Sequence, residues 1–370
     1  MAEKPKKKLT KAQRAKKKKQ RIILFIVEAI ALVVLVVALI FVSKYSKMEH
    51  TDIDESELVI NEEMKPAETV DEEQIATNEG LGSHMSNYWN IALFGVDSRK
   101  GALGKGTLSD TIIIASINKD TKDVRLASVY RDTYLNIGND SYSKANSAYA
   151  KGGPVQGINM LNMNFDLNIT DYVTVGWAGV ADTIDALGGV EIDVDSAEIE
   201  HLNNYQVETS KSLGKSYTKV TNTGLQTLNG IQAVSYCRIR YTAGDDFKRT
   251  ERQREVIQAI VDKAKSASPA TLNNAANTIF EEVSTSFSLP QVVELISDVK
   301  SYNIAETTGV PFEEFRSTGT VKGQDCVIPV TLTDSVLELH KFLFNGAEGY
   351  TPSSSVQQYS SKIASDTGKY

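Results

Sequence analysis

The sequence predicts an α/β domain in which helices cover both faces of a central mixed sheet, an α-β-α sandwich, preceded by one transmembrane helix. Three observations lead to this prediction. Short apolar segments alternate with amphipathic ones between Tyr88 and Phe344. A single long apolar run lies near the N-terminus. The composition, with 41% apolar and 24% charged residues, is typical of a globular protein.

The predicted elements follow from the period of the apolar residues. Short runs rich in Val, Ile and Tyr favour strands, and apolar residues every three or four positions favour helices. Strands are expected at residues 90–97, 110–118, 123–130, 171–176, 190–194 and 233–241, and helices at 146–165, 177–187 and 247–267. The segment 197–224 is polar, and we expect it to be rich in loops.

The N-terminus has the pattern of a membrane anchor. Residues 22–42, IILFIVEAIALVVLVVALIFV, match the ~20 apolar residues that cross a bilayer, and no small-residue cleavage site follows them. Residues 1–21 hold nine lysines and two arginines against one glutamate, an excess that stays in the cytoplasm. We therefore expect a single-pass protein of the cell membrane with its folded domain outside. The basic tail is expected to contact anionic lipid rather than nucleic acid.

Two segments flank the expected extracellular domain, 89–345. Residues 43–88 have no helical or strand period, and between Glu49 and Glu79 they hold twelve acidic residues against Lys65 alone. This pattern favours a solvated, acidic extracellular linker. Residues 346–370 are rich in Ser, Gly and Gln, which favours a disordered tail.

Positive charge is concentrated in residues 238–254, RIRYTAGDDFKRTERQR, which hold five arginines and one lysine. In the expected strand, Arg238 and Arg240 project from one face. In the expected helix, one stripe of the surface carries charged residues in its first turns and apolar residues further along, and Arg254 lies roughly on the opposite face. The stripe consists of Arg249, Arg252, Gln253, Val256 and Ile260.

These arginines predict a site for an anion. Asp245 or Asp246 can cap the helix, whose N-terminal N–H groups then face the same corner. Arginine's planar fork suits phosphate and carboxylate oxygens. The alternative is that the arginines pair with Asp and Glu on the surface.

Two aspartates at strand ends are candidate metal ligands. Asp97 ends the first expected strand and is followed by Ser98 and Arg99, and Asp110 opens the second. Such carboxylates suit Mg²⁺ or Mn²⁺, which would bridge to phosphate oxygens. Turn formation and capping are the alternative role. Arg131 follows the third expected strand and could face the same crevice.

Several catalytic classes lack their signatures in this sequence. It contains no G-x-x-x-x-G-K-[ST] phosphate loop, no G-x-S-x-G elbow and no H-E-x-x-H zinc motif. An enzyme that acts on phosphate groups outside the cell has essentially no ATP available. It must therefore hydrolyse its substrate or use a donor that is already activated. A membrane-tethered enzyme could take a lipid-linked pyrophosphate.

These residues resemble the LytR-CpsA-Psr family of Gram-positive cell envelopes. The resemblance runs from about Asn90 to Lys265 and includes FGVDSRKG, SDTIIIASINKDTKDVRLASVYRDTYLNI, KANSAYAKGG, DALGGVEIDV, GLQTLNGIQAVSYCRIRY and DDFKRTERQREVI. It implies a phosphotransferase that moves an anionic glycopolymer, such as wall teichoic acid or capsular polysaccharide, from a polyprenyl-pyrophosphate carrier to peptidoglycan.

The resemblance also implies roles for individual residues. Asp97 and Asp110 would bind the metal, Asp246 would be a candidate base, and the polyprenyl tail would run past Val256 and Ile260. The pyrophosphate would be held by Arg99, Arg131, Arg238, Arg240, Arg249, Arg252 and Gln253. The sequence departs from the family's usual pattern in having Tyr130 where proline precedes Arg131, SKAN at 143–146 where Asp-Lys-Ile-Asn is usual, and Lys248 in place of glycine.

Two other function classes stay open. One is an envelope-associated regulator of the transcriptional-attenuator type, which conflicts with a domain held outside the cell. The other is a module that binds polyprenyl phosphate or glycan without catalysis, which would not need Asp97, Asp110 and Asp246.

Cys237 and Cys326 are the only cysteines of the sequence, and both fall in segments that resemble strands. A disulfide between them is possible because the domain is expected outside the cell. Two buried free thiols are the equally weighted alternative.

Overall fold

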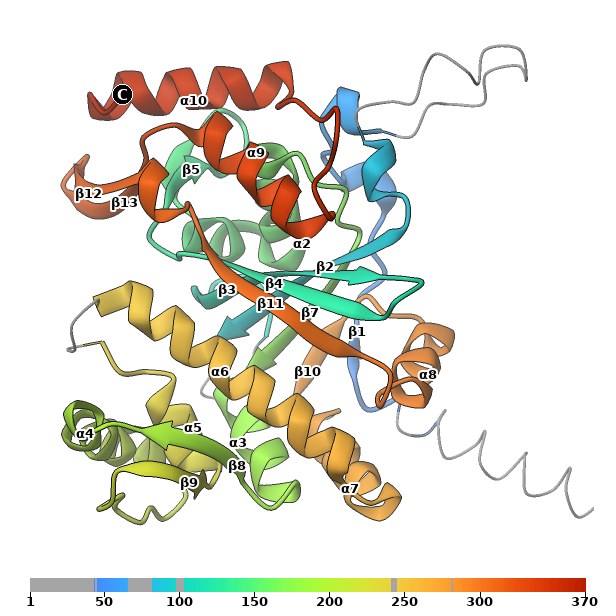
Figure 1. Cartoon of the computed structure of the whole chain (residues 1–370), viewed down its shortest axis with the longest axis vertical. Helices are drawn as coiled ribbons and strands as arrows, with labels where there is room; N and C mark the ends of the chain where they lie inside the picture. Colours follow the sequence, from blue (N-terminus) through green and yellow to red (C-terminus); the bar gives the residue numbers. More distant parts are fainter. Residues whose placement is uncertain (1–42, 44, 66–81, 98–102, 241–244, 281) are drawn as a thin grey trace, which may run out of the picture. The chain divides into compact units, whose positions relative to one another are not determined.

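The computed structural model describes residues 43, 45–65, 82–97, 103–240, 245–280 and 282–370 (Figure 1). A seven-stranded mixed sheet in the order β1-β10-β7-β2-β3-β4-β11 forms its centre. Its strands are β1 (Glu49–His50), β2 (Tyr88–Val96), β3 (Ser109–Asn118), β4 (Asp123–Val129), β7 (Asp171–Gly176), β10 (Val283–Thr285) and β11 (Asn303–Val310). Strand β2 pairs in parallel with β7 and antiparallel with β3.

Helices cover both faces of this sheet, as predicted (Figure 1). One face carries α2 (Asn146–Phe165), α9 (Leu332–Leu343) and α10 (Ser354–Thr367). The other carries α3 (Trp177–Ala186), α4 (Ser196–Leu213), α5 (Gly230–Tyr236) and α6 (Asp245–Ser266). Two further helices are α7 (Pro269–Ile279) and α8 (Leu289–Ser297). Two-stranded sheets pair β5 (Tyr134–Asn136) with β6 (Tyr142–Lys144), β8 (Val190–Val194) with β9 (Gly224–Leu228), and β12 (Arg316–Val321) with β13 (Gln324–Pro329).

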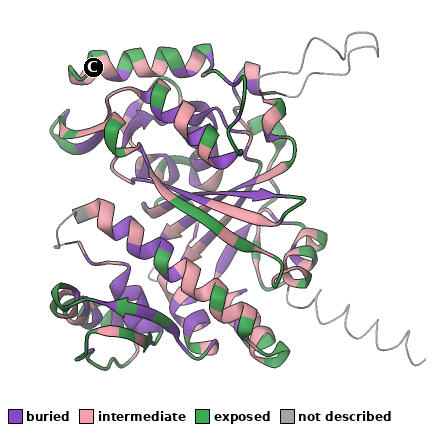
Figure 2. Ribbon diagram, viewed as in Figure 1, coloured by how far each residue is buried: buried purple, intermediate pink, exposed green. Residues whose placement is uncertain are grey.

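Two apolar clusters form the core, and Figure 2 shows buried residues on both sides of the sheet. The larger cluster joins the central sheet to α2, α9 and α10 and contains Cys326. The smaller one lies among α3, α4, α5, α6, β8 and β9 and contains Cys237. The two cysteines are therefore buried in different clusters, and both are free thiols. The disulfide considered for Cys237 and Cys326 does not form, and the alternative of two buried thiols is the one observed.

The strand predicted at 233–241 is wrong. Residues 230–236 form helix α5, and Arg238 and Arg240 lie in the irregular segment after it. Asn229 accepts a hydrogen bond from the Gln232 backbone N–H, and the Gln232 side chain accepts one from the Asn229 N–H. This capping box starts the helix and outweighs the strand propensity of the Val, Tyr and Ile residues that follow.

The loop-rich insert predicted at 197–224 is also wrong over most of its length. Helix α4 occupies Ser196–Leu213 and begins with a capping box between Asp195 and Glu198. Gly214 ends the helix in the left-handed conformation at φ 65°, which glycine adopts without steric cost. The polar composition reflects an exposed helix face, while Leu202 and Gln206 are buried against the domain.

The two flanking segments differ from the expected linker and tail. Within 43–65, Met64 is 2% exposed and Asn61 donates a hydrogen bond to the buried carboxylate of Asp166. The expected disordered tail instead contains α10, whose N-cap Ser353 also donates to Asp166. The same carboxylate accepts a hydrogen bond from Tyr350 at 2.8 Å. One buried aspartate thus holds both flanking segments against the end of α2, which composition alone could not indicate.

The expected transmembrane segment, 22–42, lies outside the described residues, as does the basic tail before it. Among the residues that the structure describes, none of the helices is both long and apolar enough to span a bilayer.

Candidate functional site

Three of the predicted arginines, Arg238, Arg240 and Arg249, lie around a cavity of about 200 Å³ beside the N-terminal half of α6, which we call the arginine cavity. It is lined by Asp110, Trp177, Tyr205, Cys237, Arg238, Arg240, Arg249 and Gln253. Arg249 and Gln253 are one helical turn apart on α6, so both reach the same space. Arg238 and Arg240 come from the irregular segment after α5, and Asp110 comes from β3. Helix α6 and the segment before it therefore bring positive charge to one place, and β3 adds a carboxylate from a distant part of the sequence.

Arg249 is the most buried arginine of this cavity, with 3% of its side chain exposed. Its two terminal nitrogens each lie 2.9 Å from a different carboxylate oxygen of Asp246. Its Nε has no hydrogen-bond partner among the described residues. Burial, together with the neighbouring Arg131 and Arg240, lowers the pKa of Arg249 to about 10 against the opposing effect of Asp246. The site therefore concentrates more positive charge than Asp246 neutralises.

Gln253 adds a second unpartnered polar group. The side chain is 4% exposed and lines the cavity, and its Oε1 has no hydrogen-bond partner among the described residues. A buried polar atom of this kind normally has a partner. A ligand in the cavity would supply one.

Arg131 and Asp110 form an ion pair at the edge of the same site. Burial lowers the pKa of Arg131, but the carboxylates of Asp110, Asp132 and Asp246 outweigh it and leave the pKa raised. Asp110 is the extra residue of a β-bulge, because Gly95 pairs with Thr111 and Val96 with Ser109. Bulges of this kind redirect a side chain at a sheet end.

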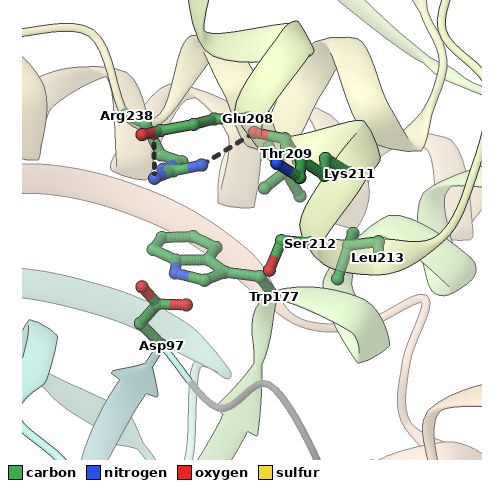
Figure 3. A pocket seen from close by; sticks show the side chains of 9 residues that line it. Asp97, Trp177, Glu208, Thr209, Lys211, Ser212, Leu213 and Arg238 are labelled. Carbon is green, nitrogen blue, oxygen red and sulfur yellow. Dashed lines mark hydrogen bonds and ion pairs between the residues drawn. The ribbon is translucent and has the colours of Figure 1, made fainter.

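A second cavity of about 430 Å³ adjoins the first and shares Trp177 and Arg238 with it (Figure 3). Asp97 lines this cavity from the end of β2, where its side chain is exposed. Arg238 donates to Thr209 at 2.9 Å and to Glu208 at 3.0 Å, both on α4. Arg238 therefore forms an ion pair of the kind considered as the alternative to an anion site, but its side chain also lines both cavities.

Some predicted residues are not brought to this site. Arg252 is 2% exposed and its Nε donates to Glu198 at 2.7 Å, on another side of α6. Val256 is a buried member of the smaller core cluster, and Ile260 packs against that cluster. Arg99 lies outside the described residues.

Other residues of the site were not predicted. Trp177 and Tyr205 line the cavity, and the Tyr205 ring lies 5.5 Å from the Arg238 guanidinium. The sequence does not indicate Tyr205, because the polar composition of 197–224 favours a loop where α4 forms. Trp177 directly follows β7, a position at a sheet end that could have identified it.

Asp97 and Asp110 are the carboxylates that could hold a divalent cation here. They lie at the same end of two adjacent antiparallel strands. Among the described residues no group of three or more His, Cys, Asp or Glu side chains is arranged to hold a metal. Mg²⁺ commonly takes only one or two carboxylates, with phosphate oxygens and water completing its shell. The pair therefore suits a cation that is held jointly with a phosphate ligand.

Sequence comparison shows that this chain is similar to proteins named as teichoic acid transferases. The chain is 36% identical over 189 residues to the polyisoprenyl-teichoic acid–peptidoglycan teichoic acid transferase TagU of Oceanobacillus iheyensis, covering 49% of this chain and 53% of the relative. It is 33% identical to TagU of Enterococcus faecalis, covering 54% of this chain and 59% of the relative. The chain thus spans a little over half of the length of these two relatives.

Solved structures share the fold. The crystal structure of TagV from Bacillus subtilis superposes with a TM-score of 0.54 at 25% identity, covering 72% of this chain and 99% of that one. A structure of the LytR-CPS2A-psr family protein YwtF (TagT) with bound octaprenyl pyrophosphate lipid gives a TM-score of 0.55 at 20% identity, covering 80% and 99%. The family model for LytR_cpsA_psr matches residues 40–335. This match extends over most of the chain, and the protein belongs to the LytR-CpsA-Psr family.

Proposed function

We propose that this protein is a phosphotransferase that attaches an anionic glycopolymer, such as wall teichoic acid, to peptidoglycan from a polyprenyl-pyrophosphate carrier. The observation that carries the proposal is the convergence of Arg238, Arg240 and Arg249 on one small cavity, with Arg131 paired to Asp110 beside it. Arg249 keeps a buried charge there beside two other arginines. A pyrophosphate would offset the repulsion between these positive charges, because each arginine could donate to its oxygens. The names of the curated relatives support the substrate class.

In the proposed reaction, a hydroxyl of the peptidoglycan glycan attacks the phosphorus that bears the polymer. A new oxygen–phosphorus bond forms, the bond to the bridging oxygen of the pyrophosphate breaks, and polyprenyl phosphate leaves with that oxygen. The arginines would stabilise the charge that develops on the leaving phosphate.

Asp246 is the proposed acceptor of the hydroxyl proton. Its side chain is 21% exposed, and its carboxylate is oriented by two nitrogens of Arg249, which lines the arginine cavity. Proton transfer to a carboxylate of this kind needs contact with the hydroxyl, either directly or through one water molecule. A non-catalytic binding module would not need that contact.

Asp97 and Asp110 would hold Mg²⁺ or Mn²⁺ together with the pyrophosphate. The cation would supply further neutralisation of phosphate charge. Arg131 would orient Asp110, to which it is paired.

We also propose that residues 22–42 anchor the chain in the cell membrane and leave the domain outside, where lipid-linked donors are displayed. The apolar run and the positive charge before it support this topology. A regulator acting on DNA is disfavoured by the same arrangement.

The test is attachment of a labelled lipid-linked polymer to purified peptidoglycan by the full-length protein in detergent. We expect transfer that stops in excess chelator and returns with Mg²⁺ or Mn²⁺. Asp110→Asn should reduce the response to the cation, whereas Asp120→Asn, in an exposed turn at the opposite end of the same strand, should not. Binding of the lipid without transfer under any metal condition would favour the binding-module alternative.

A further inference from the structure

Another cavity, of about 700 Å³, lies on the other side of α6 from the arginine cavity. One wall is a stripe of α6 that includes Lys248, Glu251, Glu255 and Asp262. The spacing of these residues makes the stripe roughly 20 Å long at 1.5 Å per residue. The facing wall comes from β8 and the start of α4. We call this cavity the α6 groove; its shape suits an extended chain.

Arg254 is the unusual residue of the α6 groove. Only 9% of the side chain is exposed, yet its Nε and Nη1 have no hydrogen-bond partner among the described residues. Burial lowers its pKa, opposed by Tyr130, Glu251 and Glu255. No carboxylate of the described chain forms an ion pair with it. Because an unpaired buried guanidinium is costly, a ligand with an acceptor group is the simplest explanation for Arg254.

The rim of the α6 groove has the opposite charge. Its lining holds seven acidic residues against three basic ones. Arg252 is already paired with Glu198, and Lys248 with Glu251 at 2.7 Å. Glu191, Asp193 and Asp262 have exposed carboxylates and form no ion pair among the described residues. A phosphate-rich polymer would be repelled by such a rim, whereas ammonium groups would be attracted.

We infer that the α6 groove binds a short peptide that carries both a carboxylate, taken by Arg254, and an ammonium group, taken by the acidic rim. The stem peptides of peptidoglycan have this chemistry, and their identification as the occupant rests on the proposed function. Lys248 lines the groove while the adjacent Arg249 lines the arginine cavity. A peptide in the groove would therefore bring its glycan to the first turns of α6, where Asp246 lies.

The experiment measures binding of a synthetic stem pentapeptide to the full-length protein by titration calorimetry. The peptide has lysine at its third position and is compared with its C-terminal amide and its Nε-acetyl-lysine form. We expect the unmodified peptide to bind about tenfold more tightly than the amide, the loss of one charge-assisted contact. Acetylation should weaken binding several-fold.

Variants assign these effects to residues. Arg254→Gln should bind the acid and the amide equally, and Asp193→Asn combined with Asp262→Asn should remove most of the preference for free lysine. Lys265→Gln, near the C-terminal end of α6 and outside the groove, should behave like the unmodified protein.

Equal binding of acid and amide by the unmodified protein would overturn the inference even if Arg254→Gln did not fold. Failure to bind at millimolar peptide would also overturn it, as would Arg254-dependent binding of poly(glycerol phosphate). Release of polyprenyl phosphate from the lipid-linked donor is measured in parallel. Peptide binding without donor turnover would contradict the proposed phosphotransferase but leave the peptide site standing, and turnover without peptide binding would do the reverse.

Discussion

Arg249 and Arg252 provide a matched test of which face of α6 binds the pyrophosphate. Both are nearly fully buried, at 3% and 2% exposure, and they lie three residues apart on the same helix. Arg249 lines the arginine cavity, whereas Arg252 is paired with the buried Glu198 beside the α6 groove. Replacing each by methionine removes the charge while keeping an unbranched side chain.

Arg249→Met should impair catalysis much more than stability. Loss of one buried charge-assisted contact to phosphate in the transition state costs about 2 to 4 kcal/mol, or about 30- to 900-fold in kcat/KM. Asp246 is already 21% exposed in the unmodified protein, so water can solvate its carboxylate after the substitution. Removing a buried guanidinium also removes its desolvation penalty, and we expect stability to change by about 1 kcal/mol or less.

Arg252→Met should show the opposite pattern. The carboxylate of Glu198 is only 6% exposed and would lose its ion-pair partner. Breaking a buried pair in this way costs about 3 to 5 kcal/mol of folding free energy. Below its melting temperature, the folded fraction should keep a kcat/KM for the donor close to that of the unmodified protein.

The assay combines polymer transfer with urea unfolding of the same preparations. Activity of Arg249→Met within about threefold of the unmodified protein, less than 0.7 kcal/mol, would refute the reasoning. So would a large activity loss in Arg252→Met without destabilisation, because Arg252 would then contact the donor as the family resemblance implies.

Three further predictions concern the rest of the fold. Asp166→Ala removes a carboxylate that accepts hydrogen bonds from Tyr350 and Ser353, and it should speed hydrogen exchange in α10; Ser365→Ala, at an exposed position of the same helix, should not. Burial lowers the pKa of His340 to about 3 from 6.5, so the unfolded chain gains a proton first as the pH falls. Stability should therefore be lost below pH 6.5, by up to about 1.4 kcal/mol per pH unit from this group, and pH titration of urea unfolding should show a flatter slope in His340→Gln; an unchanged slope would contradict the reasoning. Both cysteines should take up an alkyl group in denaturant without reduction, and intact mass showing no adduct would mean that they are bonded after all.

The sequence was sufficient for four of the seven strands of the central sheet, β2, β3, β4 and β7, because each is rich in apolar residues, whereas β1, β10 and β11 were not predicted. Residues such as Ile112, Ile113 and Ile114 are all fully buried, as expected of strands covered on both faces. The prediction failed where short-range hydrogen bonds start a helix. At Asn229 and Asp195 the residue three positions later completes a capping box, a signal more specific than the strand propensity or polar composition that was followed.

Only some residues of the site could be predicted from the sequence, because helical spacing is fixed by the backbone whereas contacts between elements are not. Helical spacing placed Arg249 and Gln253 together correctly, because 100° per residue is fixed by the backbone. The same spacing included Arg252, and only the position of Glu198 on α4 shows that Arg252 has a different partner. The predicted strand face for Arg238 and Arg240 was wrong, yet both reach the cavity from an irregular segment. Which partner lies across a helix is a property of tertiary packing, and sequence periodicity does not contain it.

The structure of the flanking segments also depends on tertiary packing that the sequence pattern does not indicate. Glycine and serine near the C-terminus favoured disorder, but Val356 and Ile363 are completely buried and attach α10 to the main core. Two apolar residues seven positions apart are a weak pattern by themselves. Their effect depends on the cluster that receives them.

The central claim is that the reaction is phosphoryl transfer at the arginine cavity. The most direct measurement follows the two phosphorus atoms of a lipid-linked polymer donor, labelled separately, during reaction of the full-length protein with peptidoglycan. We expect the polymer-proximal phosphorus to become covalently bound to peptidoglycan while the other leaves as polyprenyl phosphate. Release of both atoms together as polyprenyl pyrophosphate, or recovery of neither label in the peptidoglycan, would contradict it.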